Sequence, residues 1–376
     1  MRISARELNR ATLHRQLLLE RAPLEVAEGV RRVVALQAQH AGSPYVALWN
    51  RLSGFDPAAL DAAFAQREVV KATLMRITLH AVHAEDYRVF REAVQPTLYA
   101  SRLGSRTGLP PTEVQNLVPG LLAFAEVPRG TAEIKGWLAE RVGAAARDGA
   151  WWGLRGYAPL HHHPTGGPWS FGERPSYVAA GGGPPAAGRE GEPGALRRLV
   201  VRYLEGFGPA SVADVAQFAM VRRGPVREAL RELDDAVERL EGPDGGELFD
   251  LPGAGRPAGE TPAPPRLLGM WDSVLLAYAD RGRVVPPEYR RAVIRVNGDV
   301  LPTLLVDGWV AGVWRPVEGG IEATAFHELP EEVWDALAEE ALALYSLLAA
   351  RDPRLYHRYA HWWPRLPAGQ RRLLPG

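Results

Sequence analysis

Between residues 195 and 251 the apolar positions first follow a helical spacing and then alternate as in strands. Apolar residues recur at intervals of three and four in three successive segments, which predicts three helices. These segments are 195–204, 212–220 and 224–235. Ser211 stands at the N-cap of the second, with Asp214 three residues later. Two short runs around the glycine-rich turn 242–246 then predict a hairpin, and three helices followed by a hairpin are typical of a winged helix.

The same order of elements recurs, more loosely, in the first 180 residues. The first copy is predicted to contain helices at 4–20, 24–35 and 56–66 and strands at 69–74 and 76–82. The second copy is predicted to contain helices at 112–125 and 131–142 and a wing between 157 and 178. Repetition of this plan indicates a DNA-binding architecture more strongly than one copy does, because an isolated winged helix is often only a protein-binding module.

Two segments rich in glycine and proline read as linkers, because they favour neither helix nor strand. They are 179–194 and 252–265. Beyond the second linker, short strands are predicted at 284–285, 292–296, 303–306 and 309–314, with hairpin turns at Asn297-Gly298 and Asp307-Gly308. A helix at 331–350 and a basic, aromatic tail follow.

We therefore predict an α+β fold with about three winged-helix units and a small C-terminal β domain. The predicted units are 1–108, 109–180, 195–251 and 266–376, the last with its helix and basic tail. The length of 376 residues agrees with several units, because it exceeds what one ordinary core supports.

Composition narrows the chemistry. The chain has no cysteine, which excludes disulfides, thiolate metal sites and a cysteine nucleophile. No apolar run approaches the roughly 20 residues that a membrane span needs. Residues 2–7 carry charges where a signal peptide has its apolar segment. We therefore expect a cytoplasmic protein that acts away from membranes.

Positive charge is concentrated locally although the net charge is zero. Residues 281–295 hold five arginines against one glutamate, and Arg281 and Arg283 are candidates to contact DNA phosphates. The tail at 351–376 is also basic, and its Trp362-Trp363 pair either flanks DNA or packs against the β domain. For each of these patches an ordinary solvated face is the alternative reading.

The candidate catalytic feature is Leu36-Gln37-Ala38-Gln39. Each glutamine side chain carries both a hydrogen-bond donor and an acceptor, so a pair of them can hold a water molecule from two sides. Residues two apart share a side in extended chain but point apart in a helix. We therefore expect the preceding helix to end near Gln37 and the pair to lie on irregular backbone. The alternative is that both amides cap the helix end.

Three blocks of sequence together resemble the AlkZ-like DNA glycosylases, a superfamily of tandem winged-helix proteins. They are Leu36-Gln37-Ala38-Gln39, Met75-Arg76-Ile77-Thr78-Leu79-His80 and a long signature from Trp271 to Arg315. The resemblance implies a C-shaped clamp around duplex DNA that removes N-alkylated bases, including those in interstrand crosslinks. It carries the catalytic motif onto Gln37 and Gln39. The chain departs at position 77, where it has isoleucine and the family commonly has glycine.

This chemistry suits neutral amides. Alkylation at N7 or N3 makes a purine cationic and so a good leaving group, which leaves only the attacking water and the oxocarbenium-like sugar to be managed. Glutamine does not titrate near neutral pH, but it can orient water towards C1′ and direct its carbonyl dipole at developing positive charge. We therefore expect a monofunctional, monomeric glycosylase with no lysine Schiff base, no metal and no cofactor.

Further DNA contacts are expected beside the two glutamines. The candidates are Arg76, His80, His161, His163, Arg281 and Arg283. His80 either lines the lesion site or is buried against backbone. His161 and His163 share one face of a predicted strand, and the wing they belong to either meets DNA or is an exposed loop.

Two other functions remain open: a non-enzymatic winged-helix DNA-binding protein such as a transcription regulator, and a scaffold that binds only proteins. Helix 224–235 bears a mixture of acidic and basic side chains that is poor for reading a groove, which favours the enzyme.

Overall fold

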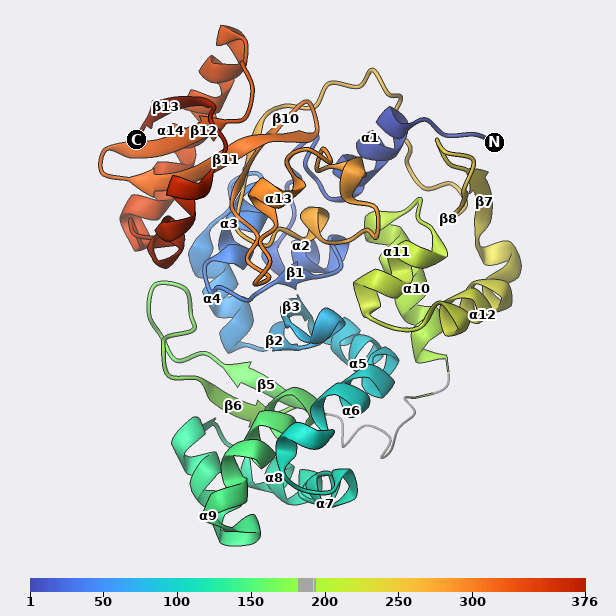
Figure 1. Cartoon of the computed structure of the whole chain (residues 1–376), viewed down its shortest axis with the longest axis vertical. Helices are drawn as coiled ribbons and strands as arrows, with labels where there is room; N and C mark the ends of the chain where they lie inside the picture. Colours follow the sequence, from blue (N-terminus) through green and yellow to red (C-terminus); the bar gives the residue numbers. More distant parts are fainter. Residues whose placement is uncertain (182–191, 193) are drawn as a thin grey trace.

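The protein has an α+β fold in which helices surround three β-sheets, as seen in a computed structural model that describes residues 1–181, 192 and 194–376. The blue N-terminal helices lie beside the orange and red C-terminal sheet, whereas the green helices α7–α9 form the opposite end (Figure 1). Most of the linker predicted at 179–194 falls outside the described residues. In the described part of the chain, no helix is long and apolar enough to cross a membrane.

The first 180 residues share a six-stranded antiparallel sheet in the order β1-β3-β2-β5-β6-β4. Its strands are β1 (Leu36–Gln37), β2 (Val69–Thr73), β3 (Leu79–His83), β4 (Arg129–Gly130), β5 (Leu160–His163) and β6 (Ser176–Ala179). Lys71 of β2 pairs with His162 of β5, so strands from residues 1–108 and 109–180 meet in one sheet.

Helices cover this sheet and connect its strands. They are α1 (Ala5–Arg15), α2 (Val26–Arg32), α3 (Ser43–Trp49), α4 (Pro57–Ala65), α5 (Ala84–Ala93), α6 (Gln95–Arg102), α7 (Pro111–Asn116), α8 (Val118–Phe124) and α9 (Thr131–Tyr157). The single helix predicted at 112–125 is two helices, because Pro119 lacks the N–H that a continuous helix would need there. The helix predicted at 131–142 instead continues to Tyr157 through a kink at Gly143, whose φ is 81°.

The middle unit contains the predicted order of three helices and a hairpin. Its elements are α10 (Ala195–Phe207), α11 (Val212–Ala219), α12 (Arg223–Leu233), β7 (Glu238–Glu241) and β8 (Glu247–Asp250). The predicted N-cap is present, because the Ser211 hydroxyl accepts from the Asp214 backbone N–H and the Asp214 carboxylate accepts from Ser211. These short-range signals were sufficient because each depends on neighbouring residues only.

The C-terminal unit is built on a five-stranded antiparallel sheet, β13-β12-β11-β10-β9, packed against α14 (Glu331–Arg351). Its strands are β9 (Arg266–Leu268), β10 (Thr303–Val306), β11 (Trp309–Val317), β12 (Gly320–Ala325) and β13 (Gln370–Pro375). The strands predicted at 284–285 and 292–296 were wrong. The first is a buried loop followed by Pro286 and Pro287, which cannot donate to a sheet, and the second overlaps the short helix α13 (Arg290–Val293).

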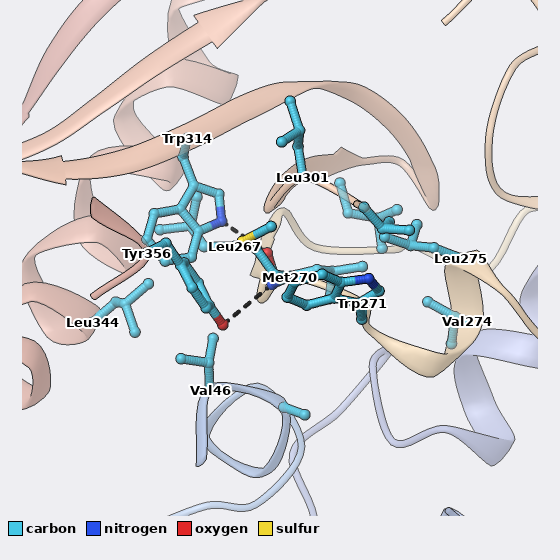
Figure 2. Packing of buried hydrophobic residues seen from close by; sticks show 14 of the residues in the cluster. Val46, Leu267, Met270, Trp271, Val274, Leu275, Leu301, Trp314, Leu344 and Tyr356 are labelled. Carbon is cyan, nitrogen blue, oxygen red and sulfur yellow. Dashed lines mark hydrogen bonds between the residues drawn. The ribbon is translucent and has the colours of Figure 1, made fainter. Parts of the chain in front are cut away.

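Two hydrophobic cores meet at the strand that carries the glutamine motif. The first joins α1–α4 to the C-terminal sheet: Figure 2 shows Val46 of α3 facing Met270, Trp314 and Tyr356. The second lies on the other side of the six-stranded sheet. Leu36 belongs to the first core and Ala35 to the second, so β1 is held from both sides.

The long signature that begins at Trp271 connects these parts of the molecule. The Ser273 hydroxyl donates to the carbonyl of Ala35 at 2.7 Å, immediately before β1. Asp272 forms a two-pronged ion pair with Arg51 in which both N···O distances are 2.8 Å and both side chains are fully buried. Asp272 is therefore a structural residue that fixes the segment beside the glutamine motif.

Candidate functional site

Gln37 lies in the edge strand β1 of the six-stranded sheet, and Gln39 lies in a bend two residues later. The expectation that the preceding helix ends near Gln37 was wrong, because α2 ends at Arg32 and Val34 has a φ of 74° that no helix accommodates. Gln37 pairs with His80 of β3, and Ala38 donates to the carbonyl of Leu79 at 2.8 Å. Only 6% of Gln37 is exposed, whereas Gln39 is exposed.

Arg76 determines how the Gln37 side chain is oriented. Its Nη2 donates to Gln37 Oε1 at 2.7 Å, so the carbonyl oxygen of that amide faces the guanidinium. The opposite end of the amide carries its N–H donors, and among the described residues the Gln37 amide nitrogen has no protein acceptor. Gln39 is held more loosely, since its Oε1 accepts from the Leu79 N–H at 3.5 Å. The side chain of Gln37 is therefore fixed by a short hydrogen bond, whereas that of Gln39 is exposed and held by one long hydrogen bond.

His80 is buried behind Gln37 and supports Arg76. Its Nδ1 lies 3.1 Å from the carbonyl of Thr78, an acceptor, so Nδ1 carries the proton and Nε2 accepts from Arg76 at 3.2 Å. Burial, together with the charge of Arg76, lowers the pKa of His80 to about 3. The ring is therefore neutral. Of the two positions expected for His80, the structure shows the buried one, with the ring hydrogen-bonded to backbone.

Arg76 itself projects from a left-handed turn. The backbone φ is 53° at Arg76 and 59° at Ile77, a region that side chains branched at Cβ avoid. The strand predicted at 76–82 is instead a short 3₁₀ turn (Met75–Ile77) followed by β3. Such strain, typical of functional sites, is maintained here by packing and aims Arg76 at Gln37. A glycine at position 77 would adopt this conformation without strain.

The two arginines predicted at 281 and 283 have different positions. Burial lowers the pKa of Arg76 to about 10, and the charge of the nearby Arg281 adds to this effect. Arg76 therefore stays cationic at neutral pH. Arg283 stacks over Tyr278 at 4.0 Å and donates to the carbonyl of Pro209 at 2.7 Å, so it joins the C-terminal unit to the middle unit.

The histidines at 161 and 163 lie away from the glutamines, on β5 at the far side of β2. His161 is buried with its ring edge-on to Tyr87 at 4.3 Å, so its side chain is not available to a DNA groove in this arrangement. His163 is partly exposed at the strand end. No group of three or more His, Cys, Asp or Glu side chains in the described part of the chain could hold a metal ion.

The buried histidines make stability depend on pH. Burial lowers the pKa of His80 to about 3 and of His161 to about 4, from an ordinary 6.5. The unfolded chain therefore binds more protons than the folded chain below pH 6.5. We expect the free energy of unfolding to fall as pH falls from 6.5 to 4, by up to about 1.4 kcal/mol per pH unit for each histidine.

Urea denaturation across this pH range checks the expectation. The variant His161→Phe keeps a ring against Tyr87 but removes a buried Nε2 that has no partner among the described residues. Its free energy of unfolding should depend less steeply on pH than that of the wild type. Equal slopes for the two proteins would contradict a neutral, buried His161.

Sequence reasoning missed two surface features, a groove beside Arg76 and an exposed apolar turn at Val296. A groove of about 1460 Å³ opens beside Arg76, between α5–α6 and α11–α12. Val296 is fully exposed at the tip of the turn between Ile294 and Val300, which Trp271 anchors through a 2.9 Å bond to the Gly298 carbonyl. The groove is assembled from segments far apart in the sequence, so no local pattern could reveal it. The turn that exposes Val296 does have a local signal, the Asn297-Gly298 pair.

Comparison with known proteins gives consistent matches. The family model for "DNA glycosylase AlkZ-like" proteins matches residues 30–347. A curated relative, the interstrand DNA cross-link repair glycosylase of Streptomyces sahachiroi, is 24% identical over 365 residues, which cover 91% of this chain and 95% of that protein. The solved structure of the DNA glycosylase AlkZ from the same organism has a TM-score of 0.77 at 21% identity, covering 92% of this chain and 96% of that one.

Proposed function

Because this chain belongs to the AlkZ-like DNA glycosylase family, we propose that it excises cationic, N-alkylated purines from duplex DNA, including bases joined in interstrand crosslinks. The relative from Streptomyces sahachiroi carries the name of a crosslink repair glycosylase, which supports this substrate class. The observation that carries the proposal is the hydrogen bond from Arg76 to Gln37 Oε1 at 2.7 Å, which leaves the amide N–H donors of Gln37 unused by the described residues.

The two glutamines act by position. Gln37 donates to the oxygen of the attacking water, and the more mobile Gln39 accepts one of its hydrogens, so that a lone pair points at C1′. The C1′–N bond breaks with its electron pair going to the alkylated purine, which leaves as a neutral base while the sugar gains the positive charge. Water then bonds to C1′ and its extra proton is lost to bulk solvent, so neither amide needs to remove a proton. Neutral lesions such as uracil lack this advantage and are poor substrates.

Lysine chemistry is not part of the proposed reaction. Lys71 pairs with Ala81, one residue along from the His80–Gln37 row, and successive residues of a strand point to opposite faces. Its ammonium lies 4.3 Å from the centre of the Phe171 ring, on the face away from Gln37. Lys135 is ion-paired with Asp148 at 2.8 Å. These positions support a monofunctional glycosylase.

The proposed DNA-binding form is a monomer whose three winged-helix units and β domain form a C-shaped clamp. The order α10–α11–α12–β7–β8 supports the unit at 195–251. In that unit, both carboxylates of α12 are paired with arginines, Glu228 with Arg231 and Glu232 with Arg197 of α10. The helix therefore carries acidic side chains among its arginines, which suits the reading of bases poorly and gives the regulator alternative no added support.

Incubation of the protein with oligonucleotides that contain 7-methylguanine or a nitrogen-mustard crosslink tests the proposal. Subsequent heating in alkali cleaves each abasic site, so strand breaks at the lesion measure excision. The proposal expects breaks with both substrates and none with a uracil-containing duplex. Absence of breaks at 7-methylguanine under saturating protein would reject it.

Arg76→Leu should reduce excision without abolishing it. The variant keeps both glutamines but removes the donor that orients Gln37, so the single-turnover rate of 7-methylguanine release should fall about 10- to 100-fold. Arg227→Leu, on the exposed face of α12, is the matched control and should react like the wild type. A wild-type rate for Arg76→Leu would show that Gln37 needs no partner.

A further inference from the structure

A basic site lies at the C-terminal end of α6, the end that is farther from the middle unit. A cavity of about 410 Å³ is lined by α6, the turn after it and Trp152 of α9. It shares Ile77, Ala100 and Ser101 with the larger groove that begins at Arg76. The two hollows therefore run together, from the residue that holds Gln37 to the junction of α6 and α9.

Two arginines without carboxylate partners line the smaller cavity, and a third, Arg155, lies on α9 three residues after Trp152, on the same side of the helix. Arg102 and Arg106 line it, and Arg155 is near enough that its charge, together with that of Arg106, adds to the effect of burial in lowering the Arg102 pKa. No described carboxylate is within ion-pair distance of any of the three. The other arginines of residues 95–157 differ, because each has such a partner. They are Arg129 with Glu133, Arg141 with Glu140 and Arg147 with Asp148.

Trp152 holds two of these guanidinium groups in place. The Arg102 and Arg106 guanidinium carbons lie 5.0 and 5.5 Å from the centre of its ring. Stacking of this kind reduces the freedom of the arginine side chains, so an anion that binds them loses less entropy. Like charges gathered without counter-charges indicate a site for an anion.

Arg102 also touches the turn that carries the catalytic machinery. Its Nη2 donates to the carbonyl of Ile77 at 3.3 Å, and the neighbouring Arg76 donates to Gln37. Gly156 of α9 makes this approach possible, because a Cβ there would lie 2.7 Å from Arg102 Nε. A group bound at Arg102 is therefore connected to the Arg76–Gln37 hydrogen bond through the Ile77 carbonyl, which belongs to the residue next to Arg76.

We propose that Arg102, Arg106 and Arg155 bind backbone phosphates of the DNA strand that flanks the lesion, with Trp152 as the platform for Arg102 and Arg106. This inference rests on the proposed function. The lining of the smaller cavity contains two arginines and no carboxylate, whereas Glu92 and Glu192 line the larger groove, where Glu192 is ion-paired with Arg198 at 3.2 Å. The smaller cavity is therefore the more favourable of the two for a phosphate. The site would fix the strand relative to the Ile77 turn and so relative to Gln37 and Gln39.

Salt dependence of binding tests the site. Arg106 and Arg155 are exposed, so the variant Arg106→Gln/Arg155→Gln should fold normally, as thermal unfolding checks. With undamaged duplex, the slope of log K against log salt should become less steep by about 0.9 for each phosphate that the variant no longer neutralises, and affinity should fall about 10-fold or more. Arg141→Gln is the matched control, since Arg141 also stacks on a tryptophan, Trp137 at 4.0 Å, but has a carboxylate partner. It should keep the wild-type slope.

Neutral methylphosphonates placed one at a time along each strand then locate the phosphates that the arginines bind. On a duplex that carries one lesion, substitution at one or two positions flanking the lesion should weaken binding by the wild type. The same substitutions should have a smaller effect in the double variant, which keeps only Arg102 of the three arginines. A wild-type salt slope in the double variant would overturn the phosphate site. So would methylphosphonates that weaken binding of the double variant and of the wild type by the same factor at every position. Because the salt slopes are measured on undamaged duplex, a protein that fails to release 7-methylguanine but shows the expected change in slope would keep the site and lose only the proposed reaction.

Discussion

Replacing both Gln37 and Gln39 by alanine is expected to reduce 7-methylguanine excision by about 1000-fold while duplex affinity changes little. Gln37 is fixed by Arg76, and Gln39 is exposed beside it, so together they supply the geometry that places water at C1′. Alanine removes every polar atom of both side chains but leaves the extended backbone of β1, which is buried between two cores. Single-turnover release of the base measures the reduction, and fluorescence anisotropy measures affinity.

The single variants distinguish the two roles. Gln37→Ala should reduce the rate of 7-methylguanine excision more than Gln39→Ala does, because Arg76 holds the Gln37 side chain in one orientation. Gln115→Ala, on α7 and half-buried, is the control for a glutamine outside the site. Wild-type excision by the double alanine variant would refute the assignment of these glutamines, whatever the protein binds.

Asp272→Ala is expected to lower the free energy of unfolding by about 3–5 kcal/mol, the largest stability effect of any single change considered. Arg51 and Asp272 are both fully buried and joined by two hydrogen bonds of 2.8 Å, so removal of the carboxylate leaves a guanidinium without a counter-charge inside the core. The Asp272 carboxylate also accepts from the Val274 N–H at 3.2 Å. Urea denaturation of the variant beside the wild type measures the destabilisation.

The double variant Arg51→Met/Asp272→Leu tests the cause. If the cost arises from the unpaired charge, replacing both partners with apolar side chains should recover much of the stability. Glu228→Ala breaks the exposed pair with Arg231 and should change stability little, since water screens that pair. Asp272→Ala within about 1 kcal/mol of wild type would show that the pair does not hold the segment before β1.

Local signals were reliable where neighbouring residues decide the conformation. The helices and hairpin of 195–251 and the Asp307-Gly308 turn between β10 and β11 are present, because capping, helical periodicity and glycine turns act over a few residues. The same reasoning failed at 292–296, where the chain forms the end of the short helix α13 and a single bridge from Ile294 to Val300, and only Val293 is buried. It also failed at Arg76 and Ile77, where the tertiary structure holds the backbone in a left-handed turn that local preference disfavours.

The sequence by itself determined the mixed α+β character, the positions of most helices and turns, and the glutamine pair with its family. Only the tertiary structure decided that Arg76 orients Gln37, that His80 and His161 are buried, and that Arg102 and Arg106 meet at Trp152. The reason is physical. A helix or hairpin follows from contacts a few residues apart, whereas a site is formed by contacts between segments whose positions are settled only when the two cores close around β1.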